Sequence, residues 1–278
     1  MPTRRNSRRN SQRSANPYEA AAAGRPAGSI GWRVHYFEEL ESTQETARAL
    51  AAQGALHGEV VVAEQQSAGR GRMGRRWHSP PGVNFYGTFI LRPDLPVAEA
   101  ALLSLVAGVA VAEAMESVAP GIVALKWPND VWLAGRKVGG IIAEAVTDTR
   151  QRLACVLLGI GINLNLPPEQ IPDDLRGKAT SVLAATGRPC DRTTLAAALF
   201  SRLDTRYMET LSGGFAAVWP AWERYSALTG RRVAVVDGCN RLCGTVSGIA
   251  ADGALLLDTE VGTLRVLAGD VTVEGAYD

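Results

Sequence analysis

The sequence predicts an α+β protein, built as a mixed or antiparallel sheet with packed helices and followed by a small all-β unit. Two observations predict this class. Between about residues 32 and 229, hairpin-linked apolar strands alternate with helices that need a sheet to cover their apolar faces. From Arg231 onward, short strands about ten residues apart are separated by glycine-containing turns. The composition, 46% hydrophobic and 21% charged over 278 residues, is that of a globular chain with one large core or two modest ones.

The first 29 residues are rich in Arg, Ser, Asn, Ala and Gly, and their first acid is Glu19. This composition predicts a disordered tail over residues 1–29, and we expect residues 1–28 to be dispensable. The arginine- and serine-rich start also resembles an organelle transit peptide, although no apolar face accompanies the arginines. The segment shows no apolar helical periodicity either, so we expect no helix-turn-helix and no specific DNA partner.

The elements that follow are predicted from apolar patterning and from capping residues. Ser42 or Thr43 is expected to cap an alanine-rich helix that runs to about Gln53. Before the middle of the chain, strands are predicted at 33–37, 59–64 and 84–91, and a long apolar helix at 96–118.

The second half of the core begins with hairpin-linked strands, in which Pro128-Asn129-Asp130 marks a turn. These strands are predicted at 123–127, 131–133, 137–146 and 152–165. Helices are predicted at 180–185, at 192–211 after an Asp191 cap, and at 215–228. The final all-β unit is predicted to contain strands at 233–236, 242–249, 254–257, 263–267 and 271–273.

The segment Ala68–Trp77 is the most unusual stretch, because its ten residues include three glycines and four arginines. Glycine lets a ligand approach the backbone closely, and the arginine fork matches carboxylate and phosphate oxygens. The pattern therefore predicts an anion-binding loop, with a solvated basic turn or a nucleic-acid patch as the alternatives. It lacks the glycine spacing of a P-loop or of a dinucleotide fingerprint.

Charge and cysteine content exclude several function classes. The net charge of +1 gives no overall attraction to nucleic acid or to an anionic membrane. The four cysteines lack paired metal spacing, even though Cys239 and Cys243 fall in one predicted hairpin, so we expect free thiols in a reducing cytoplasm. No run approaches 18 uncharged apolar residues, so no membrane partner is expected. Only three of the 29 basic residues are lysines, namely Lys126, Lys137 and Lys178.

Three further motifs follow the loop along the chain. Lys126-Trp127-Pro128-Asn129-Asp130 precedes Arg136-Lys137, and Gly159-Ile160-Gly161-Ile162-Asn163 comes next. With the loop and the C-terminal strands, the sequence resembles the biotin–protein ligase family from about residue 32 to the end. The resemblance implies a class II synthetase-like biotin/lipoate ligase catalytic domain at 30–229 and an SH3-like barrel at 230–278. It also implies a form without the N-terminal DNA-binding domain, because only a short tail precedes the catalytic segment.

The resemblance implies an ATP-dependent enzyme that activates biotin as biotinyl-5′-AMP. The acyl group would then pass to a specific lysine of the biotin carboxyl carrier domain of a carboxylase. The first step brings a carboxylate to a triphosphate, and Arg70, Arg72 and Lys137 are suited to offset their repulsion, with Mg²⁺ bridging the phosphates. The metal ligands are unknown, and the resemblance also allows a homodimer.

Site residues follow from the same resemblance, position by position. Lys137, Arg72 and Asp130 are implied as catalytic, with Asp130 beside the reaction centre. The implied biotin-binding positions are Ser42, Thr43, Gln66, Gly69, Arg70, Arg72, Lys137 and Gly140. The implied nucleotide-binding positions are Arg72, Trp77, Lys137 and Asn163.

Two alternative functions are also compatible with the sequence. A lipoate or octanoate–protein ligase shares the catalytic fold, but its acyl chain is wholly apolar, and the Gly-Arg-Gly-Arg loop favours biotin. A biotin-responsive DNA-binding repressor would use the basic loop and tail, and the missing helix-turn-helix and the net charge of +1 argue against it.

Overall fold

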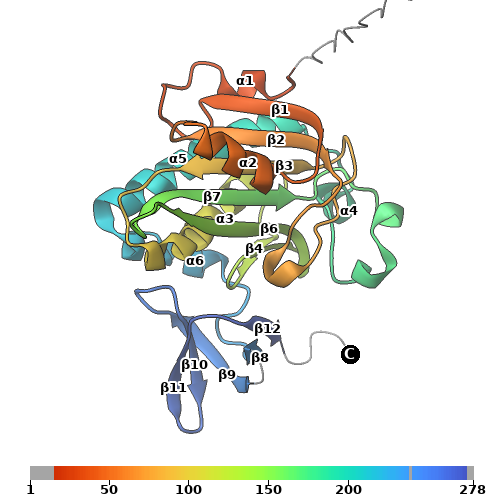
Figure 1. Cartoon of the computed structure of the whole chain (residues 1–278). Helices are drawn as coiled ribbons and strands as arrows, with labels where there is room; N and C mark the ends of the chain where they lie inside the picture. The colour runs from red at the N-terminus through yellow and green to blue at the C-terminus, as the bar shows by residue number, and fades with distance from the viewer. Residues whose placement is uncertain (1–15, 238–239, 274–278) are drawn as a thin grey trace, which may run out of the picture.

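The computed structural model describes residues 16–237 and 240–273, which form two β-sheets (Figure 1). Cys239 and the ends of the predicted tail and barrel, 1–15 and 274–278, lie outside the described residues. The larger sheet has seven strands in the order β1-β2-β3-β7-β6-β5-β4. Only β1 and β2 pair in parallel, so the sheet is mixed and the predicted α+β class is confirmed. Its strands are β1 Arg33–Leu40, β2 Glu59–Gln66, β3 Phe85–Leu91, β4 Val123–Lys126, β5 Asp130–Leu133, β6 Arg136–Thr147 and β7 Leu153–Ile162.

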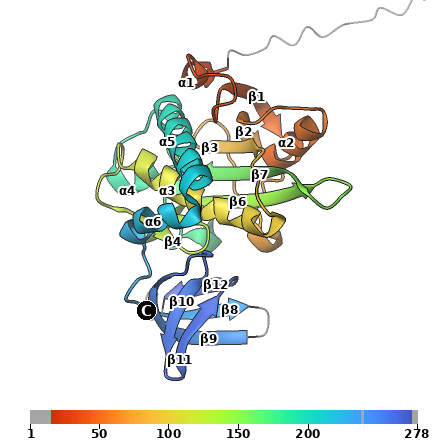
Figure 2. The same ribbon diagram turned by 90° about the vertical axis from the view of Figure 1, so that its left-hand side faces the viewer.

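Helices cover both faces of this sheet. The α2 helix lies on one face against β2, β3 and β7, and α3, α5 and α6 lie on the other (Figure 2). The α-helices are α1 Glu19–Ala22, α2 Thr43–Ala52, α3 Leu103–Met115, α4 Val182–Thr186, α5 Arg192–Gly213 and α6 Trp219–Tyr225. Short 3-10 turns are η1 Arg72–Gly74, η2 Val97–Leu102, η3 Pro168–Gln170, η4 Asp173–Leu175 and η5 Phe215–Ala217.

Capping residues begin the helices where the sequence predicts. The Ser42 side chain accepts a hydrogen bond from the Gln44 backbone N–H, and Asp191 accepts one from Thr194. Two long helices predicted from apolar patterning are shorter or divided. The 96–118 segment starts as a 3-10 turn, and the 215–228 segment restarts as α6 because Pro220 sits at the start of a new helix, where its missing N–H costs nothing.

The α3 helix is the centre of the hydrophobic core that packs against the seven-stranded sheet. Eleven of its 13 residues are buried, between the sheet and α5. With η2 it forms a 19-residue stretch, Val97–Met115, that is long enough and apolar enough to cross a membrane, with a mean hydropathy of 1.8. About 61% of that stretch is buried inside the protein, and the core helix of a soluble protein meets the same test.

The predicted disordered tail is wrong for residues 16–29. Tyr18 is 1% exposed, and its ring packs against Tyr36 and Phe85 with centroids 6.3 and 5.9 Å apart. Arg25 Nε donates to the Ile30 carbonyl at 2.8 Å, which fixes the chain where it enters β1. The composition of the segment could not predict this contact, because it depends on one aromatic residue. The apolar partners of Tyr18 come from β1 and β3 rather than from its own neighbours in sequence.

The second sheet contains five antiparallel strands in the order β11-β10-β9-β8-β12. The Trp127 indole N–H donates to the Gly253 carbonyl at 3.0 Å, and the Trp219 indole N–H donates to the Ala251 carbonyl at 3.0 Å. Both carbonyls lie in the turn between β9 and β10. These bonds attach the second sheet to the first. Its strands are β8 Arg232–Asp237, β9 Asn240–Ile249, β10 Leu255–Thr259, β11 Gly262–Val266 and β12 Asp270–Val273.

Glu59 begins β2 as a buried carboxylate, 2% exposed, that joins β2 to β1. It lies 2.6 Å from His35 Nε2, and its other oxygen accepts from the Leu56 backbone N–H at 3.0 Å. Burial raises the pKa of Glu59, but the hydrogen bonds from His35 and Leu56 outweigh burial, so that its pKa lies below the usual value.

A lowered folded-state pKa means that Glu59 stabilises the fold above its unfolded pKa and loses this contribution as pH falls through the lower, folded value. We therefore expect Glu59→Gln to reduce the free energy of unfolding by about 1–3 kcal/mol at pH 7, and by less at about pH 3. Urea unfolding at both pH values measures this difference, with exposed Glu39→Gln as the control. An equal loss at both pH values would contradict the assignment.

Candidate active site

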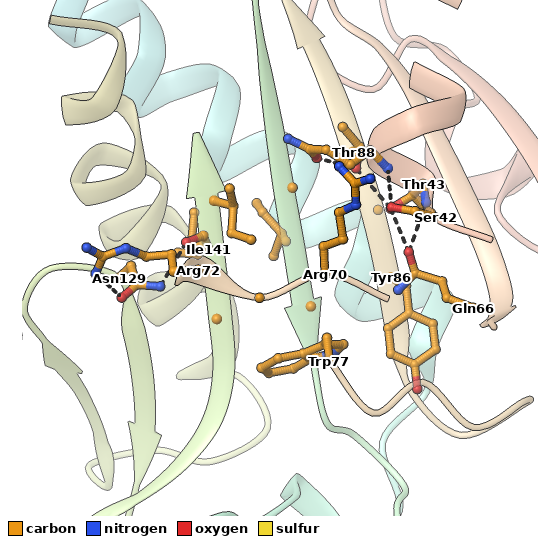
Figure 3. Close-up of a pocket in the computed structure, with 18 of the residues that line it drawn as sticks. Ser42, Thr43, Gln66, Arg70, Arg72, Trp77, Tyr86, Thr88, Asn129 and Ile141 are labelled. Carbon is orange, nitrogen blue, oxygen red and sulfur yellow. Dashed lines mark hydrogen bonds between the residues drawn. The ribbon is translucent and has the colours of Figure 1, made fainter. Parts of the chain in front are cut away.

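The inner pocket lies on the α2 side of the seven-stranded sheet, and its empty space is about 530 Å³ when the open solvent at its mouth is included (Figure 3). The start of α2, the end of β2, the arginine loop (residues 68–77) and the middle of β3, β6 and β7 form its walls. Its lining residues are Ser42, Thr43, Gln44, Gln66, Arg70, Gly71, Arg72, Trp77, Tyr86, Gly87, Thr88, Asn129, Lys137, Gly140, Ile141, Ile142, Gly159, Ile160 and Gly161.

One end of the inner pocket is a cluster of hydroxyl and amide groups. Gln66 Oε1 accepts from both the backbone N–H and the hydroxyl of Thr43, at 2.9 and 3.1 Å. The Thr88 hydroxyl lies 2.9 Å from the Thr43 hydroxyl and 3.0 Å from Gln44 Oε1. Ser42 lies beside them and is 3% exposed. The cluster offers donors and acceptors in a buried place, which suits a neutral polar head group.

Sequence reasoning found Ser42, Thr43 and Gln66 in this cluster but missed Gln44 and Thr88. Thr88 is a polar residue within β3, all of whose seven residues are buried, and that contrast was an available signal. Gln44 lies in the first turn of α2, where a polar residue is usually exposed; here it is 6% exposed. Both residues acquire partners only because β3, β7 and α2 meet.

The centre of the pocket is apolar and narrow. Ile142 and the Trp77 ring line it, and the ring lies over paired glycines of β6 and β7. Ile141 and Ile160 border the pocket only with their backbone, because their side chains are buried in the core that contains α3. A Cβ at Gly161 would lie 2.7 Å from the Trp77 ring, and one at Gly140 would lie 3.1 Å from it. Gly140 was expected to give a ligand room at the backbone; it lines the pocket and also makes room for Trp77.

Lys137 lines the charged end of the pocket and pairs there with Asp130. Lys137 Nζ lies 2.6 Å from Asp130 Oδ1 and 5.5 Å from the centre of the Trp77 ring. Beside this pair, Arg72 Nη1 donates to Asn129 Oδ1 at 3.0 Å. The hairpin of β5 and β6 brings Asp130 and Lys137 together, and the structure thus gathers the three residues proposed as catalytic. Asn129 was predicted only as a turn residue, and its side chain contacts the arginine loop.

Each arginine of the loop has a hydrogen-bond or ion-pair partner, and three of the four partners are distant in the sequence. Arg70 pairs with Glu45 of α2 at 2.5 Å, Arg75 pairs with Asp270 of β12, and Arg76 donates to the Ser67 carbonyl at 3.0 Å. Arg70 was implied as a biotin-binding residue that offsets the repulsion between the carboxylate and the triphosphate. It lines the inner pocket, but its guanidinium is engaged by the carboxylate of Glu45 in this structure.

Gly69 is needed for a close approach within the loop. A Cβ there would lie 2.6 Å from the Trp77 carbonyl oxygen, and the Trp77 N–H donates to the Gly69 carbonyl at 2.9 Å. The loop therefore closes on itself as a tight hairpin that carries Trp77 back over the sheet. Gly69 does not line the inner pocket, in contrast to the position expected of a biotin-binding residue.

The outer cleft is a second space, of about 1370 Å³, that shares Arg72, Trp77 and Lys137 with the inner pocket. One wall is apolar, formed by Leu166, Ile171, Pro172, Leu175 and Ala179, and the other is rich in cations. Asn163 lies at this cleft, 8% exposed, and its amide donates to the Thr180 carbonyl at 3.1 Å. An apolar wall facing cations suits a molecule with a flat ring and an anionic tail.

The described residues do not build a metal cage. Among residues 16–237 and 240–273, no group of three or more His, Cys, Asp or Glu side chains could hold an ion. The acidic side chains of the outer cleft are Asp130 and Asp270, and each is paired with a cation. Mg²⁺ is often held by one or two carboxylates plus substrate phosphates, so this donor set fits an ion carried mainly by a nucleotide.

Comparisons with known proteins agree with this geometry. Residues 36–163 match the Biotin/lipoate A/B protein ligase family, and residues 229–273 match the Biotin protein ligase C terminal domain. The chain is 36% identical over 254 residues to the biotin--[acetyl-CoA-carboxylase] ligase of Mycobacterium tuberculosis, covering 88% of this chain and 90% of that protein. It is 36% identical over 242 residues to the bifunctional ligase/repressor BirA of Bacillus subtilis, covering 87% and 74%.

A solved structure extends the similarity to the whole fold. The biotin protein ligase from Aquifex aeolicus in complex with biotin and ATP has a TM-score of 0.75 at 30% identity, covering 87% of this chain and 98% of that one. Fold and site therefore define a protein ligase of the biotin/lipoate class. Within this class, the chain belongs to the biotin protein ligase family.

Proposed function

We propose that this protein condenses biotin with ATP to biotinyl-5′-AMP and transfers the biotinyl group to a lysine of a biotin carboxyl carrier domain. One observation carries the proposal: the inner pocket joins a buried hydroxyl–amide cluster to the Lys137–Asp130 pair through an apolar middle. This order of polar, apolar and charged walls matches a ureido head, an aliphatic chain and a carboxylate. The Aquifex aeolicus relative is described with biotin and ATP bound.

The proposed chemistry follows from the charges at one end of the pocket. The biotin carboxylate attacks the α-phosphorus of ATP, and pyrophosphate leaves. Lys137 and Arg72 would offset the repulsion between the two anions and stabilise charge on the reacting phosphoryl oxygens. The carrier lysine, as a free amine, then attacks the acyl carbonyl and AMP leaves. Mg²⁺, carried on the nucleotide, would supply further charge neutralisation, and Asp130 is the protein carboxylate placed to approach it.

Incubation of the pure protein with biotin, ATP and MgCl₂, followed by mass spectrometry, tests the proposal. Biotinyl-adenylate is expected without a carrier, and biotinylated carrier domain is expected when one is added. Competition between labelled biotin and lipoate distinguishes a biotin ligase from a lipoate ligase, the nearest alternative. The buried cluster around Thr43, Gln66 and Thr88 would be left without partners by an apolar acyl chain, so biotin is expected to win. Preferential use of lipoate would overturn the substrate assignment.

We also place the reaction in the cytoplasm, because the described cysteines, Cys155, Cys190 and Cys243, are free thiols. Burial raises the pKa of the Cys190 thiol to about 11, which makes this cysteine a poor nucleophile, and it lines neither the inner pocket nor the outer cleft. No DNA-binding role is included in the proposal. A homodimer remains a prediction that sedimentation can test.

Arg72 is expected to retain the adenylate, since its guanidinium lines both the inner pocket and the outer cleft. We expect Arg72→Gly to raise the dissociation rate of biotinyl-adenylate about 10- to 100-fold, the loss of one charge-assisted phosphate contact. Stopped-flow displacement of the bound adenylate measures this rate. Met73→Gly is the control, because it also places a glycine in this loop, at a residue that is 69% exposed and lines neither cavity. Its φ of 55° is one that glycine adopts without strain, so the loop is not disturbed. Equal rates in the two variants would contradict the role of Arg72.

A further inference from the structure

All three lysines of the chain line the outer cleft. The other 26 basic residues are arginines, so lysine is concentrated at one place in the molecule. Two of the three have partners of their own. Lys137 pairs with Asp130, and Lys126 lies with its Nζ 5.2 Å from the centre of the Trp132 ring, where burial lowers the pKa of the lysine. Lys178 is exposed, and within the described ranges its side chain makes no hydrogen bond or ion pair.

The backbone around Lys178 is fixed, although its side chain is free. The Lys178 carbonyl accepts from the Lys137 N–H at 2.9 Å, and the Thr180 N–H donates to the Lys137 carbonyl at 2.8 Å. These two bonds place residue 179 beside Lys137 like a short parallel strand. On its other side, the Lys178 N–H donates to the Leu175 carbonyl at 3.0 Å. The segment therefore holds the Lys178 ammonium, unpaired among the described residues, at the cleft, next to Ala179, the residue that pairs with Lys137.

The charges of the cleft define what this ammonium could bind. The two acidic residues of the lining, Asp130 and Asp270, are already paired with Lys137 and Arg75. No carboxylate of the described lining is left for Lys178, so its charge is available to an anionic ligand. ATP carries most of its charge on the β- and γ-phosphates, whereas biotinyl-adenylate retains a single phosphate, which Arg72 and Lys137 are placed to hold.

We propose that Lys178 binds the β- and γ-phosphates of ATP, and hence the departing pyrophosphate, as an additional binding residue of this ligase. The inference rests on the proposed function, because it assigns ATP to the outer cleft. It follows that Lys178 acts in adenylate formation and has no part in holding biotin or the finished adenylate. An ammonium suits this role because it is a compact charge on a flexible stem and can follow pyrophosphate as it leaves.

The test compares Lys178→Ala, Lys178→Gln and Lys178→Arg in the full-length protein. We expect Ala and Gln to raise the KM for ATP about fivefold to 20-fold, the usual range for one exposed charge-assisted phosphate contact. The KM for biotin and the affinity for purified biotinyl-adenylate should stay within about twofold. Arg should restore most of the ATP affinity, since it keeps the charge. Inhibition by added pyrophosphate should weaken in parallel in the Ala and Gln variants.

Arg176→Ala is the matched control, since Arg176 lies two residues away, is exposed, and pairs with Asp173 at 2.8 Å outside the cleft lining. It should leave every constant unchanged. An unchanged KM for ATP in both Lys178→Ala and Lys178→Gln would overturn the inference, as would an equal loss of affinity for ATP and for the adenylate. If the wild-type protein forms no biotinyl-adenylate, the proposed function itself fails. An active wild type with unaffected Lys178 variants refutes this inference alone.

Discussion

Replacing Lys137 with alanine is expected to slow adenylate formation by about 10²- to 10⁴-fold while the protein stays folded. Lys137 is one of two cations, with Arg72, that line both the inner pocket and the outer cleft. Removing such a group costs about 3–5 kcal/mol of transition-state stabilisation. The substitution also leaves Asp130 without its partner at 2.6 Å, so a carboxylate then faces the incoming biotin carboxylate and triphosphate. Single-turnover release of pyrophosphate measures the step.

Two further variants separate these effects. Arg136→Ala changes the exposed neighbour on the same strand, which lines neither cavity, and should leave the rate unchanged. Lys137→Ala combined with Asp130→Asn sets the repulsion by Asp130 against its role beside Mg²⁺. A rate above that of Lys137→Ala alone shows that the uncompensated carboxylate repels the substrates, and a lower rate shows that Asp130 is needed beside the metal. A folded Lys137→Ala protein that releases pyrophosphate at the wild-type rate would remove Lys137 from the catalytic group.

Removing residues 1–27 is expected to destabilise the protein by about 3–5 kcal/mol, the range for truncating a buried aromatic side chain. The effect comes from Tyr18, whose ring fills a space between Tyr36 of β1 and Phe85 of β3. Chemical unfolding of proteins that start at Asn16 and at Gly28 locates the loss. The first should match the full-length protein, and the second should not.

Substitutions at Tyr18 make the same test without truncation. Tyr18→Ala should reproduce most of the loss. Tyr18→Phe should be neutral or stabilising, because the buried Tyr18 hydroxyl has no hydrogen-bond partner among the described residues. Full stability of the protein that starts at Gly28 would show that the contacts of Tyr18 contribute nothing.

Much of the fold could be predicted from local patterns. Ser42 and Asp191 mark helix starts because a capping side chain bonds to backbone groups two or three residues away. The hairpin strands around Pro128 and the short C-terminal strands follow from apolar alternation and turn residues, which also act over a few positions. Tyr18 was missed because its partners are 18 and 67 positions further along the chain.

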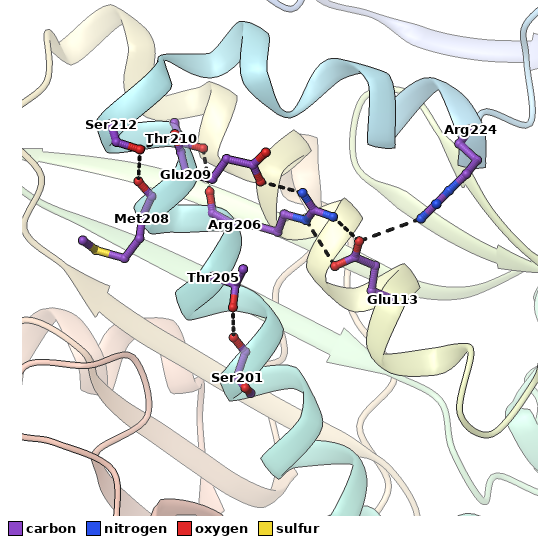
Figure 4. Close-up of polar contacts among 9 residues, drawn as sticks. All are labelled: Glu113, Ser201, Thr205, Arg206, Met208, Glu209, Thr210, Ser212 and Arg224. Atoms are coloured by element: carbon purple, nitrogen blue, oxygen red, sulfur yellow. Dashed lines mark hydrogen bonds and ion pairs between the residues drawn. The ribbon is translucent and has the colours of Figure 1, made fainter.

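Contacts between helices show the same limit. Glu113 of α3, 9% exposed at its side chain, pairs with Arg206 of α5, and Arg224 of α6 approaches it to 3.9 Å (Figure 4). Arg206 also pairs with Glu209 one turn along its own helix at 2.5 Å. The second pair has the i, i+3 spacing that a sequence can reveal, whereas the pair with Glu113 joins residues 93 positions apart.

The candidate site divides in the same way. The sequence by itself determined which chemical groups are present: a loop of arginines and glycines, Lys137 at the start of a strand, and hydroxyls at a helix start. Only the tertiary structure decided how these groups are used. It buried Gln44 and Thr88 in the polar cluster, engaged Arg70 with Glu45, and brought Lys178 beside Lys137. The physical reason is that a side chain's chemistry is a property of its residue, whereas its partner, burial and charge balance depend on elements that meet only when the sheet is assembled.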